Sequence, residues 1–157
     1  MEQNLKNYLE KYNIKYEIYP HEAVFTVAES KKIKQKIPGL HTKCLFLKDE
    51  YSHFYLICLS AEKRLNTNQL RKKFNLKELY FASPEELKSN LNLTPGSVSL
   101  FGMIYSNSVF LIIDKDLWDA ESVGFHPNIN TATIVLNHEN LEKFYNSLKA
   151  KKEIIEL

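Results

Sequence analysis

The chain has 157 residues, of which 44% are hydrophobic, and it contains nine tyrosines, nine phenylalanines and one tryptophan. This content predicts one folded domain, residues 1–157, with a packed core rather than a disordered chain. The 21 basic and 19 acidic side chains leave a net charge of +2. That balance excludes a strongly basic protein that holds long stretches of nucleic-acid phosphate, but not one that grips only the end of an RNA.

Membrane and metal signals are absent from the sequence. No apolar run approaches the ~20 residues that cross a bilayer, and the first residues lack the apolar segment of a signal peptide. The two cysteines, Cys44 and Cys58, each lie inside an apolar run, as reduced core thiols of a cytoplasmic protein do. No Cys/His pair has the spacing of zinc ligands, so we expect neither a metal nor a cofactor.

The first half of the chain reads as two helices followed by a hairpin. Apolar side chains at helical spacing predict a helix over residues 2–12, and alternation predicts a strand over 14–19. A capping-box pattern at Thr26 begins a second helix that runs to about Ile37. Its four lysines are interpreted as a solvated face, with RNA contact as the alternative: Lys31, Lys32, Lys34 and Lys36. Residues 43–48 and 54–59 are rich in β-forming side chains and predict a hairpin.

The second half alternates short strands and helices irregularly. Helices are predicted over 66–74, from Ser83 with its Pro-Glu-Glu start, as one turn over 114–118, and after Asn137. Strands are predicted at 79–82, 122–125 and 131–136, and a second hairpin at 99–105 and 109–113. The tail from Lys149 is expected to fray. This irregular order favours an α+β fold with a mixed or antiparallel sheet, curled like a barrel, with helices around it.

Familiar catalytic motifs are missing. The sequence has no Gly-x-Ser-x-Gly elbow, Walker loop, Rossmann glycine fingerprint or His-Glu-x-x-His. Cysteines inside strands are usually inert. An enzyme built on this chain would therefore act by positioning and backbone donors rather than by a side-chain nucleophile.

Three local clusters could still carry chemistry. The segment 39–43 ends in Lys43, which could be a phosphate ligand or simply a surface lysine. The segment 94–102 holds two of the four glycines, Gly96 and Gly102. It is either a tight turn or a loop that aims several N–H groups at one oxygen. His126 stands between an aromatic residue and a proline, which suits a substrate-orienting or proton-transferring imidazole as well as a structural one.

Taken in order, five segments resemble one family. These are His21–Val27, Gly39–Lys43, Phe81–Glu85, Thr94–Val98 and Phe125–Pro127 continuing through Asn130–Thr133. The series is similar to the prolyl-tRNA editing proteins of the YbaK/ProX superfamily, in particular the free-standing ProX type, over nearly the whole chain. The resemblance implies an editing-domain fold and a trans-editing hydrolase that removes alanine from mischarged tRNA(Pro). It also implies tRNA(Pro) as a partner and leaves association with prolyl-tRNA synthetase open.

The same resemblance assigns roles to residues. Lys43 would contact the terminal adenosine or its phosphate, His126 would orient the aminoacyl group, and the backbone of the glycine loop would line the aminoacyl pocket. Water, helped by the substrate's ribose hydroxyl, would cleave the ester. The catalytic residues implied are Lys43, His126, Gly96 and Ser97. The substrate-binding residues implied are Thr42, Cys44, Val98, Ser99, Leu100, Phe101, Gly102, Phe125, Pro127 and Asn130.

Three residues depart from the family pattern. Leu100 replaces the proline of the Gly-x-x-x-Pro loop, Cys44 replaces a common asparagine, and Gly124 replaces another. These departures keep two alternatives open. One is a deacylase for Cys- or Ser-charged tRNA, and the other is a catalytically weak module that binds tRNA or the synthetase.

Overall fold

The computed structural model describes residues 1–23 and 27–157, and the side chain of Val27 also lies outside the description. Its helices are α1 (Gln3–Lys11), α2 (Val27–Lys34), α3 (Thr67–Lys73), α4 (Pro84–Leu91), the 3-10 helix η1 (Leu100–Tyr105), α5 (Lys115–Trp118) and α6 (His138–Ser147). Its strands are β1 (Glu17–Pro20), β2 (Leu40–Asp49), β3 (Phe54–Ser60), β4 (Leu79–Phe81), β5 (Phe110–Asp114), β6 (Ser122–Phe125), β7 (Ala132–Asn137) and β8 (Lys152–Ile155).

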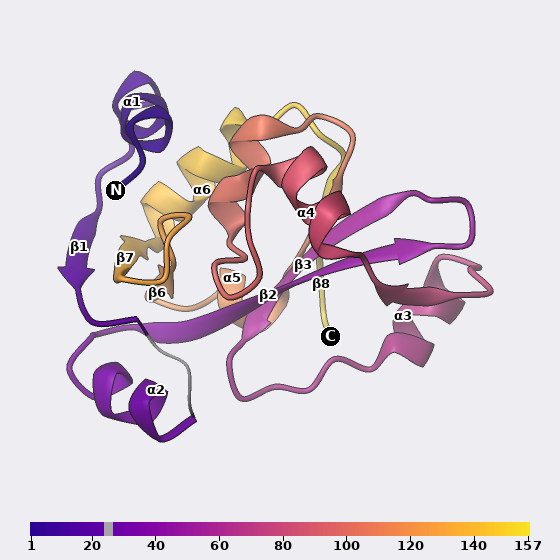
Figure 1. Cartoon of the computed structure of the whole chain (residues 1–157), viewed down its shortest axis with the longest axis horizontal. Coiled ribbons are helices and arrows are strands. Elements are labelled where there is room, and N and C mark those ends of the chain that lie inside the picture. The colour runs from indigo at the N-terminus through magenta and orange to yellow at the C-terminus, as the bar shows by residue number, and fades with distance from the viewer. Residues whose placement is uncertain (24–26) are drawn as a thin grey trace.

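All eight strands belong to one mixed sheet, in the order β1-β7-β6-β2-β3-β5-β8, with β4 beside β2 (Figure 1). The long strand β2 joins its two halves. On one side β2 is antiparallel to β3, and on the other it runs parallel to β6. The strands at the two ends of this order, β1 and β8, do not pair with each other in the described part of the chain. The predicted α+β fold is thus confirmed, but the sheet stays open rather than closing into a barrel.

Helices cover both faces of the sheet, which explains the continuous apolar strands. On β3, Leu56 and Cys58 belong to a core that also contains side chains of α1, α4, η1 and α6. The alternate residues Tyr55, Ile57 and Leu59 point to a second, smaller core under α3. A strand that is buried on both faces has no polar side to show, so it reads as an uninterrupted apolar run.

Several predicted elements are confirmed with shifted boundaries. The first hairpin pairs Lys43 with Leu59 and Lys48 with Phe54. Helix α4 has the full capping box, in which the Ser83 hydroxyl accepts from the Glu86 amide and the Glu86 carboxylate accepts from the Ser83 amide. The Asn137 side chain caps α6. The proposed Thr26 cap lies outside the described residues, and α2 ends at Lys34, before the predicted limit.

Two local predictions are wrong. Residues 100–105 form η1 instead of the first strand of a second hairpin, and β5 pairs in parallel with β3 and β8. Short apolar runs carry no period that separates a strand from a buried helical turn. The tail does not fray, because β8 completes the sheet beside β5 and the amide of Leu157 donates to the buried carboxylate of Asp114.

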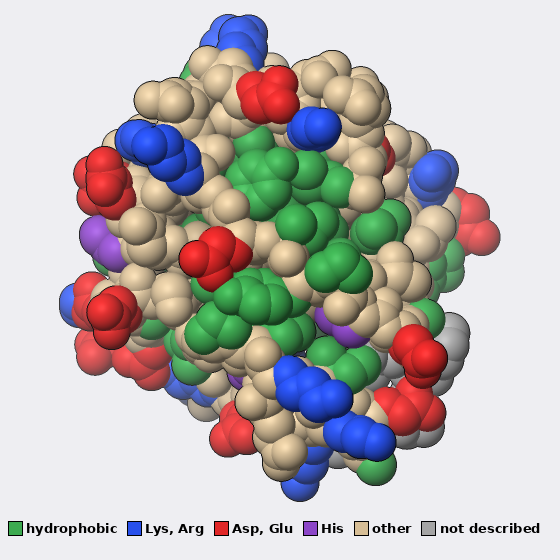
Figure 2. Space-filling model, turned by 90° about the vertical axis from the view of Figure 1, so that its left-hand side faces the viewer, with side chains coloured by type: hydrophobic (Ala, Val, Ile, Leu, Met, Phe, Trp, Pro, Cys, Tyr) green, Lys and Arg blue, Asp and Glu red, His purple; other side chains and the backbone are tan. Residues whose placement is uncertain are grey.

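Figure 2 shows the face that carries the left-hand elements of Figure 1, among them α1 and β1. Apolar side chains gather in the middle of this face, a histidine is visible beside them, and basic side chains lie below. Among the described residues, no helix is both long and apolar enough to cross a membrane.

Candidate active site

The candidate site lies where β2 and β6 separate. The two strands pair only at Leu40–Val123 and His41–Gly124. Beyond that point two adjoining cavities open between the next residues of each strand. Both cavities are lined by Thr42, Lys43, Phe125 and His126. The Thr42 hydroxyl donates to the Gly124 carbonyl oxygen at 2.5 Å and so holds the strands together at the edge of the opening.

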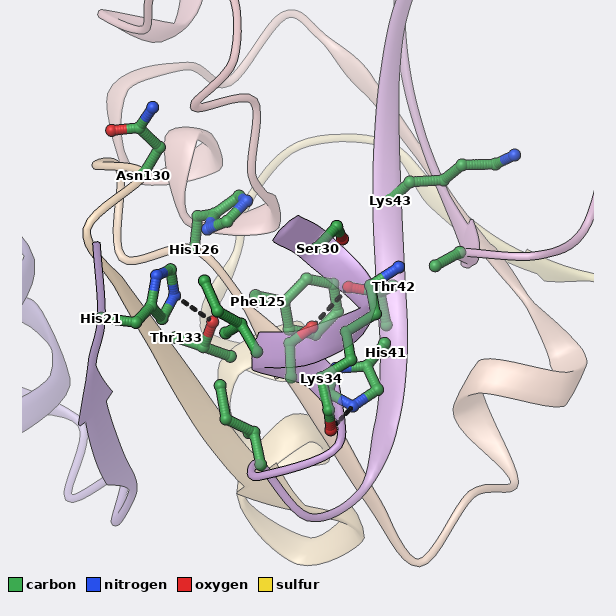
Figure 3. A pocket seen from close by; sticks show the side chains of 14 residues that line it. His21, Ser30, Lys34, His41, Thr42, Lys43, Phe125, His126, Asn130 and Thr133 are labelled. Atoms are coloured by element: carbon green, nitrogen blue, oxygen red, sulfur yellow. Dashed lines mark hydrogen bonds between the residues drawn. The ribbon is translucent and has the colours of Figure 1, made fainter. Parts of the chain in front are cut away.

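The first cavity, of about 240 Å³, is rich in imidazoles. His21, His41 and His126 all line it, together with Thr133 and Lys34 (Figure 3). The Thr133 hydroxyl lies 3.0 Å from His21 Nε2, and the His21 and His126 ring centroids are 6.4 Å apart. The His41 ring donates from Nε2 to the Lys34 carbonyl oxygen at 3.0 Å, which ties α2 to β2. This wall offers imidazole and hydroxyl groups together with two lysines, Lys34 and Lys43.

The second cavity, of about 230 Å³, is lined by Cys44, Gly96 and Val98 in addition to the shared wall. Gly96 has φ +89°, and a Cβ built on it would meet nothing within 4 Å. Its backbone is therefore open to a ligand, which is where glycine permits close approach. The Cys44 thiol contacts that of Cys58 at 3.1 Å. Burial raises the pKa of Cys58, so this thiol pair has the character of core rather than of an activated nucleophile.

His126 is held in one tautomer. Its Nδ1 lies 3.2 Å from the carbonyl oxygen of Ala132. Because a carbonyl can only accept, Nδ1 carries the proton and Nε2 keeps its lone pair. Burial lowers the pKa of His126 below its usual 6.5, with a smaller contribution from the nearby His21. The ring is therefore neutral at pH 7, with an acceptor nitrogen that no described residue occupies.

Lys43 is the cation at the junction of the cavities. It lies within β2 rather than at the end of a loop, and its side chain extends away from the histidines (Figure 3). Its ammonium group makes no hydrogen bond or ion pair with any residue in the described ranges. By contrast, Lys48 on the same strand is bound to Glu86 at 2.9 Å. Lys43 thus presents an unneutralised charge beside the opening, as a ligand for an anion would.

Comparison with known proteins identifies the family of the chain. The family model of the aminoacyl-tRNA editing domain matches residues 21–144, a stretch that includes both cavities. The chain belongs to the aminoacyl-tRNA editing domain family. The resemblance seen in the sequence is confirmed, and the protein is placed among the aminoacyl-tRNA editing enzymes.

Individual relatives agree. The chain is 35% identical over 138 residues to the prolyl-tRNA editing protein ProX of Acetoanaerobium sticklandii, covering 86% of this chain and 84% of that protein. It is 29% identical over 150 residues to the prolyl-tRNA synthetase associated domain-containing protein 1 of Xenopus laevis, covering 92% and 89%. A solved candidate trans-editing enzyme for prolyl tRNA synthetase superimposes with a TM-score of 0.75 at 18% identity, over 100% of this chain and 98% of that one. That likeness concerns the fold alone.

The editing fold brings together eight of the fourteen residues implied by the sequence. Those that line a cavity are Thr42, Lys43, Cys44, Gly96, Val98, Phe125, His126 and Asn130. The other six lie on neither cavity: Ser97, Ser99, Leu100, Phe101, Gly102 and Pro127. Leu100 and Phe101 are fully buried in the main core. The amide of Ser97 already donates to the Thr94 carbonyl oxygen at 3.1 Å, whereas those of Gly96 and Val98 donate to no described residue.

Several residues of the first cavity escaped the sequence analysis. His21 and Thr133 were part of the segments that carried the family resemblance, and this was the available signal. His41 also lies in one of these segments, and Lys34 was noted only as one of the four lysines of the second predicted helix. Ser30 had no signal, because only the packing of α2 beside β2 brings it to the cavity. In the described ranges, no group of three or more His, Cys, Asp or Glu side chains could hold a metal ion.

Proposed function

We propose that this editing enzyme removes alanine from mischarged tRNA(Pro), acting in trans in the cytoplasm. The observation that carries the proposal is the pair of adjoining cavities with one shared wall, which contains Lys43 and His126. The end of an aminoacyl-tRNA likewise has two parts, an amino acid and an adenosine, joined by an ester. With one part in each cavity, the ester lies at the shared wall.

The lining of each cavity favours one orientation. The second cavity, with Cys44, Val98 and Phe125, suits a small apolar side chain such as a methyl group. The first cavity, with its imidazoles and hydroxyls, suits the hydrogen-bonding edge of an adenosine. In this orientation Lys43 neutralises the phosphate that precedes the terminal adenosine, since a lysine binds phosphate as a point charge.

The chemistry needs no side-chain nucleophile. The lone pair on His126 Nε2 accepts a hydrogen bond from the α-amino group and so orients the ester. Water, assisted by the neighbouring ribose hydroxyl, attacks the carbonyl carbon. The new carbon–oxygen bond forms, the bond to the ribose oxygen breaks, and that oxygen leaves with a proton as the free tRNA hydroxyl. The free amides of Gly96 and Val98 are the candidate donors to the oxyanion, and a well-placed donor contributes ~3–4 kcal/mol.

Physical limits on recognition explain why such an enzyme is needed. A synthetase pocket built for proline cannot reject alanine strongly, because a missing methylene or two in an apolar contact is worth only ~1–3 kcal/mol. A second, smaller site that hydrolyses what fits it corrects the error. We propose the acceptor end of tRNA(Pro) as the substrate, and prolyl-tRNA synthetase as the enzyme whose errors are removed.

The test is deacylation of preformed Ala-tRNA(Pro), with Pro-tRNA(Pro), Cys-tRNA(Pro), Ser-tRNA(Pro) and Ala-tRNA(Ala) in parallel. We expect hydrolysis of Ala-tRNA(Pro) and none of Pro-tRNA(Pro). Preferential hydrolysis of the Cys- or Ser-charged tRNA would replace alanine by that amino acid. Binding of the tRNAs without any hydrolysis would refute the proposal.

A further inference from the structure

Ser99 connects the glycine loop to the histidine. Its side chain is fully buried and lines neither cavity. Its hydroxyl donates to the carbonyl oxygen of His126 at 2.5 Å and accepts from the amide of Phe101 at 3.1 Å. A serine hydroxyl has one proton, and here that proton goes to the backbone of His126. The hydroxyl is thus a bridge between two segments that lie 27 residues apart.

The bridge is one of two attachments that fix His126. Ser99 holds the backbone oxygen, and the carbonyl of Ala132 holds the ring through Nδ1. Behind them, the Phe125 and Phe101 rings pack edge to face, with centroids 5.9 Å apart. Without the Ser99 hydroxyl, the Phe101 amide loses its partner in the core and the His126 carbonyl loses its partner in a partly buried position. Buried groups left unpaired are costly, so the segment would shift to find new partners.

We propose that Ser99 is a positioning residue for editing. Its hydroxyl locks His126 to the glycine loop, so that Nε2 of the imidazole and the open backbone at Gly96 face the same substrate. This inference rests on the proposed function, in which both groups act on one aminoacyl ester. A reacting group displaced by ~1 Å can lower a rate by ~100-fold, which is why a hydroxyl outside the cavities can matter to catalysis.

The test compares Ser99→Ala with Ser106→Ala. Ser106 lies at the opposite end of η1, where its hydroxyl accepts from the amides of Ser108 and Val109, both at 3.2 Å. The two variants remove the same atom from the two ends of one helix, but only the first frees His126. In single-turnover deacylation of Ala-tRNA(Pro), we expect Ser99→Ala to lose about tenfold or more in rate. We expect Ser106→Ala to keep the wild-type rate and Ser99→Thr, which retains the hydroxyl, to recover most of it.

A second measurement does not depend on activity. Nitrogen-15 NMR of the histidine rings reports which nitrogen of His126 is protonated. We expect the Nδ1-protonated form in the wild type and in Ser106→Ala, and a mixture of tautomers in Ser99→Ala. If the wild type hydrolyses no mischarged tRNA, the proposed function fails while this spectrum still tests the bridge.

Three results would overturn the inference. The first is an unchanged His126 spectrum in Ser99→Ala, and the second is an altered spectrum with an unchanged rate. The third is an equal loss of rate in Ser106→Ala, which would show a merely structural role for both hydroxyls. If Ser99→Ala does not fold, Ser99→Cys provides the same comparison, because it fills a similar space with a weaker donor.

Discussion

Replacing Gly96 by alanine separates backbone strain from loss of the site. At φ +89°, Gly96 adopts a conformation that side chains disfavour, and a Cβ there would meet nothing within 4 Å. The expected loss of stability is therefore conformational alone, ~1–2 kcal/mol. The methyl group would nevertheless lie on the wall of the second cavity, which Gly96 lines. Crowding of that kind costs ~1–3 kcal/mol, and about 1.4 kcal/mol is a tenfold change, so we expect kcat/KM for Ala-tRNA(Pro) to fall by about tenfold.

Gly39 offers a matched control, because its φ is also +89°. A Cβ on Gly39 would lie 2.7 Å from the Ser122 hydroxyl oxygen and 3.2 Å from the Ser122 backbone. Gly39→Ala should therefore lose more stability than Gly96→Ala, by a further ~1–3 kcal/mol for the crowding. Gly39 lines neither cavity of the site. We expect its alanine variant to deacylate at nearly the wild-type rate wherever it is folded.

The two variants are compared by guanidinium unfolding and by deacylation at a temperature where both are folded. Stability should decrease from the wild type to Gly96→Ala to Gly39→Ala. Deacylation activity should decrease from the wild type to Gly39→Ala to Gly96→Ala. If Gly39→Ala loses as much activity as Gly96→Ala, or if Gly96→Ala keeps the wild-type kcat/KM, the glycine loop does not line the aminoacyl pocket.

Four further predictions follow from the same contacts. Lys43→Ala should abolish deacylation and change the unfolding free energy by less than ~0.5 kcal/mol. The control Lys48→Ala, which breaks an ion pair, should keep activity. A large loss of stability in Lys43→Ala would contradict this prediction. Deacylation should be constant near neutral pH and fall as acid protonates His126, whose pKa burial places below 6.5. As the pH is lowered, the unfolded chain takes up this proton first, near pH 6.5, so the unfolding free energy should decrease as the pH falls below that value, and less steeply in His126→Gln. Equal slopes in the two proteins would rule this out. Leu100→Pro should lose stability, by ~2 kcal/mol or more, because a fully buried side chain leaves the core. The backbone at the first position of η1 should tolerate proline, so the folded variant should still deacylate the tRNA, and loss of deacylation in a folded variant would contradict this. Removal of residues 152–157 should strongly lower the melting temperature because it strips β8 from β5, and an unchanged melting curve would mean that the tail does not hold the sheet.

Local signals in the sequence were accurate where one short segment determines its own structure. Ser83 and Asn137 cap their helices as their side chains predict, since a cap needs only neighbouring backbone amides. The first hairpin likewise follows from two β-rich runs joined by a short turn. Leu100 replaces the proline of the family pattern at the first position of η1, where proline is tolerated, and its side chain fills the core.

Contacts between segments that are distant in the chain were not predicted from the sequence. Residues 100–105 carry strand-like side chains, yet they form a 3-10 helix that packs against α4 and α1. Residues 152–155 look like a loose tail until β5 offers them an edge. Both outcomes depend on partners distant in the chain, which local propensity does not contain.

The site shows the same division. By itself, the sequence determined the fold class, the editing family and the residue types at the centre, because Lys43, the glycine loop and His126 lie in segments that carry the family pattern. Only the tertiary structure decided which of these side chains meet. The separation of β2 from β6 opens the cavities, one of which Gly96 lines. The packing of η1 places the Ser99 hydroxyl outside the cavities and against the backbone of His126. The geometry of the site depends on the distances between side chains from segments far apart in the chain, and the packing of the sheet and its helices sets these distances.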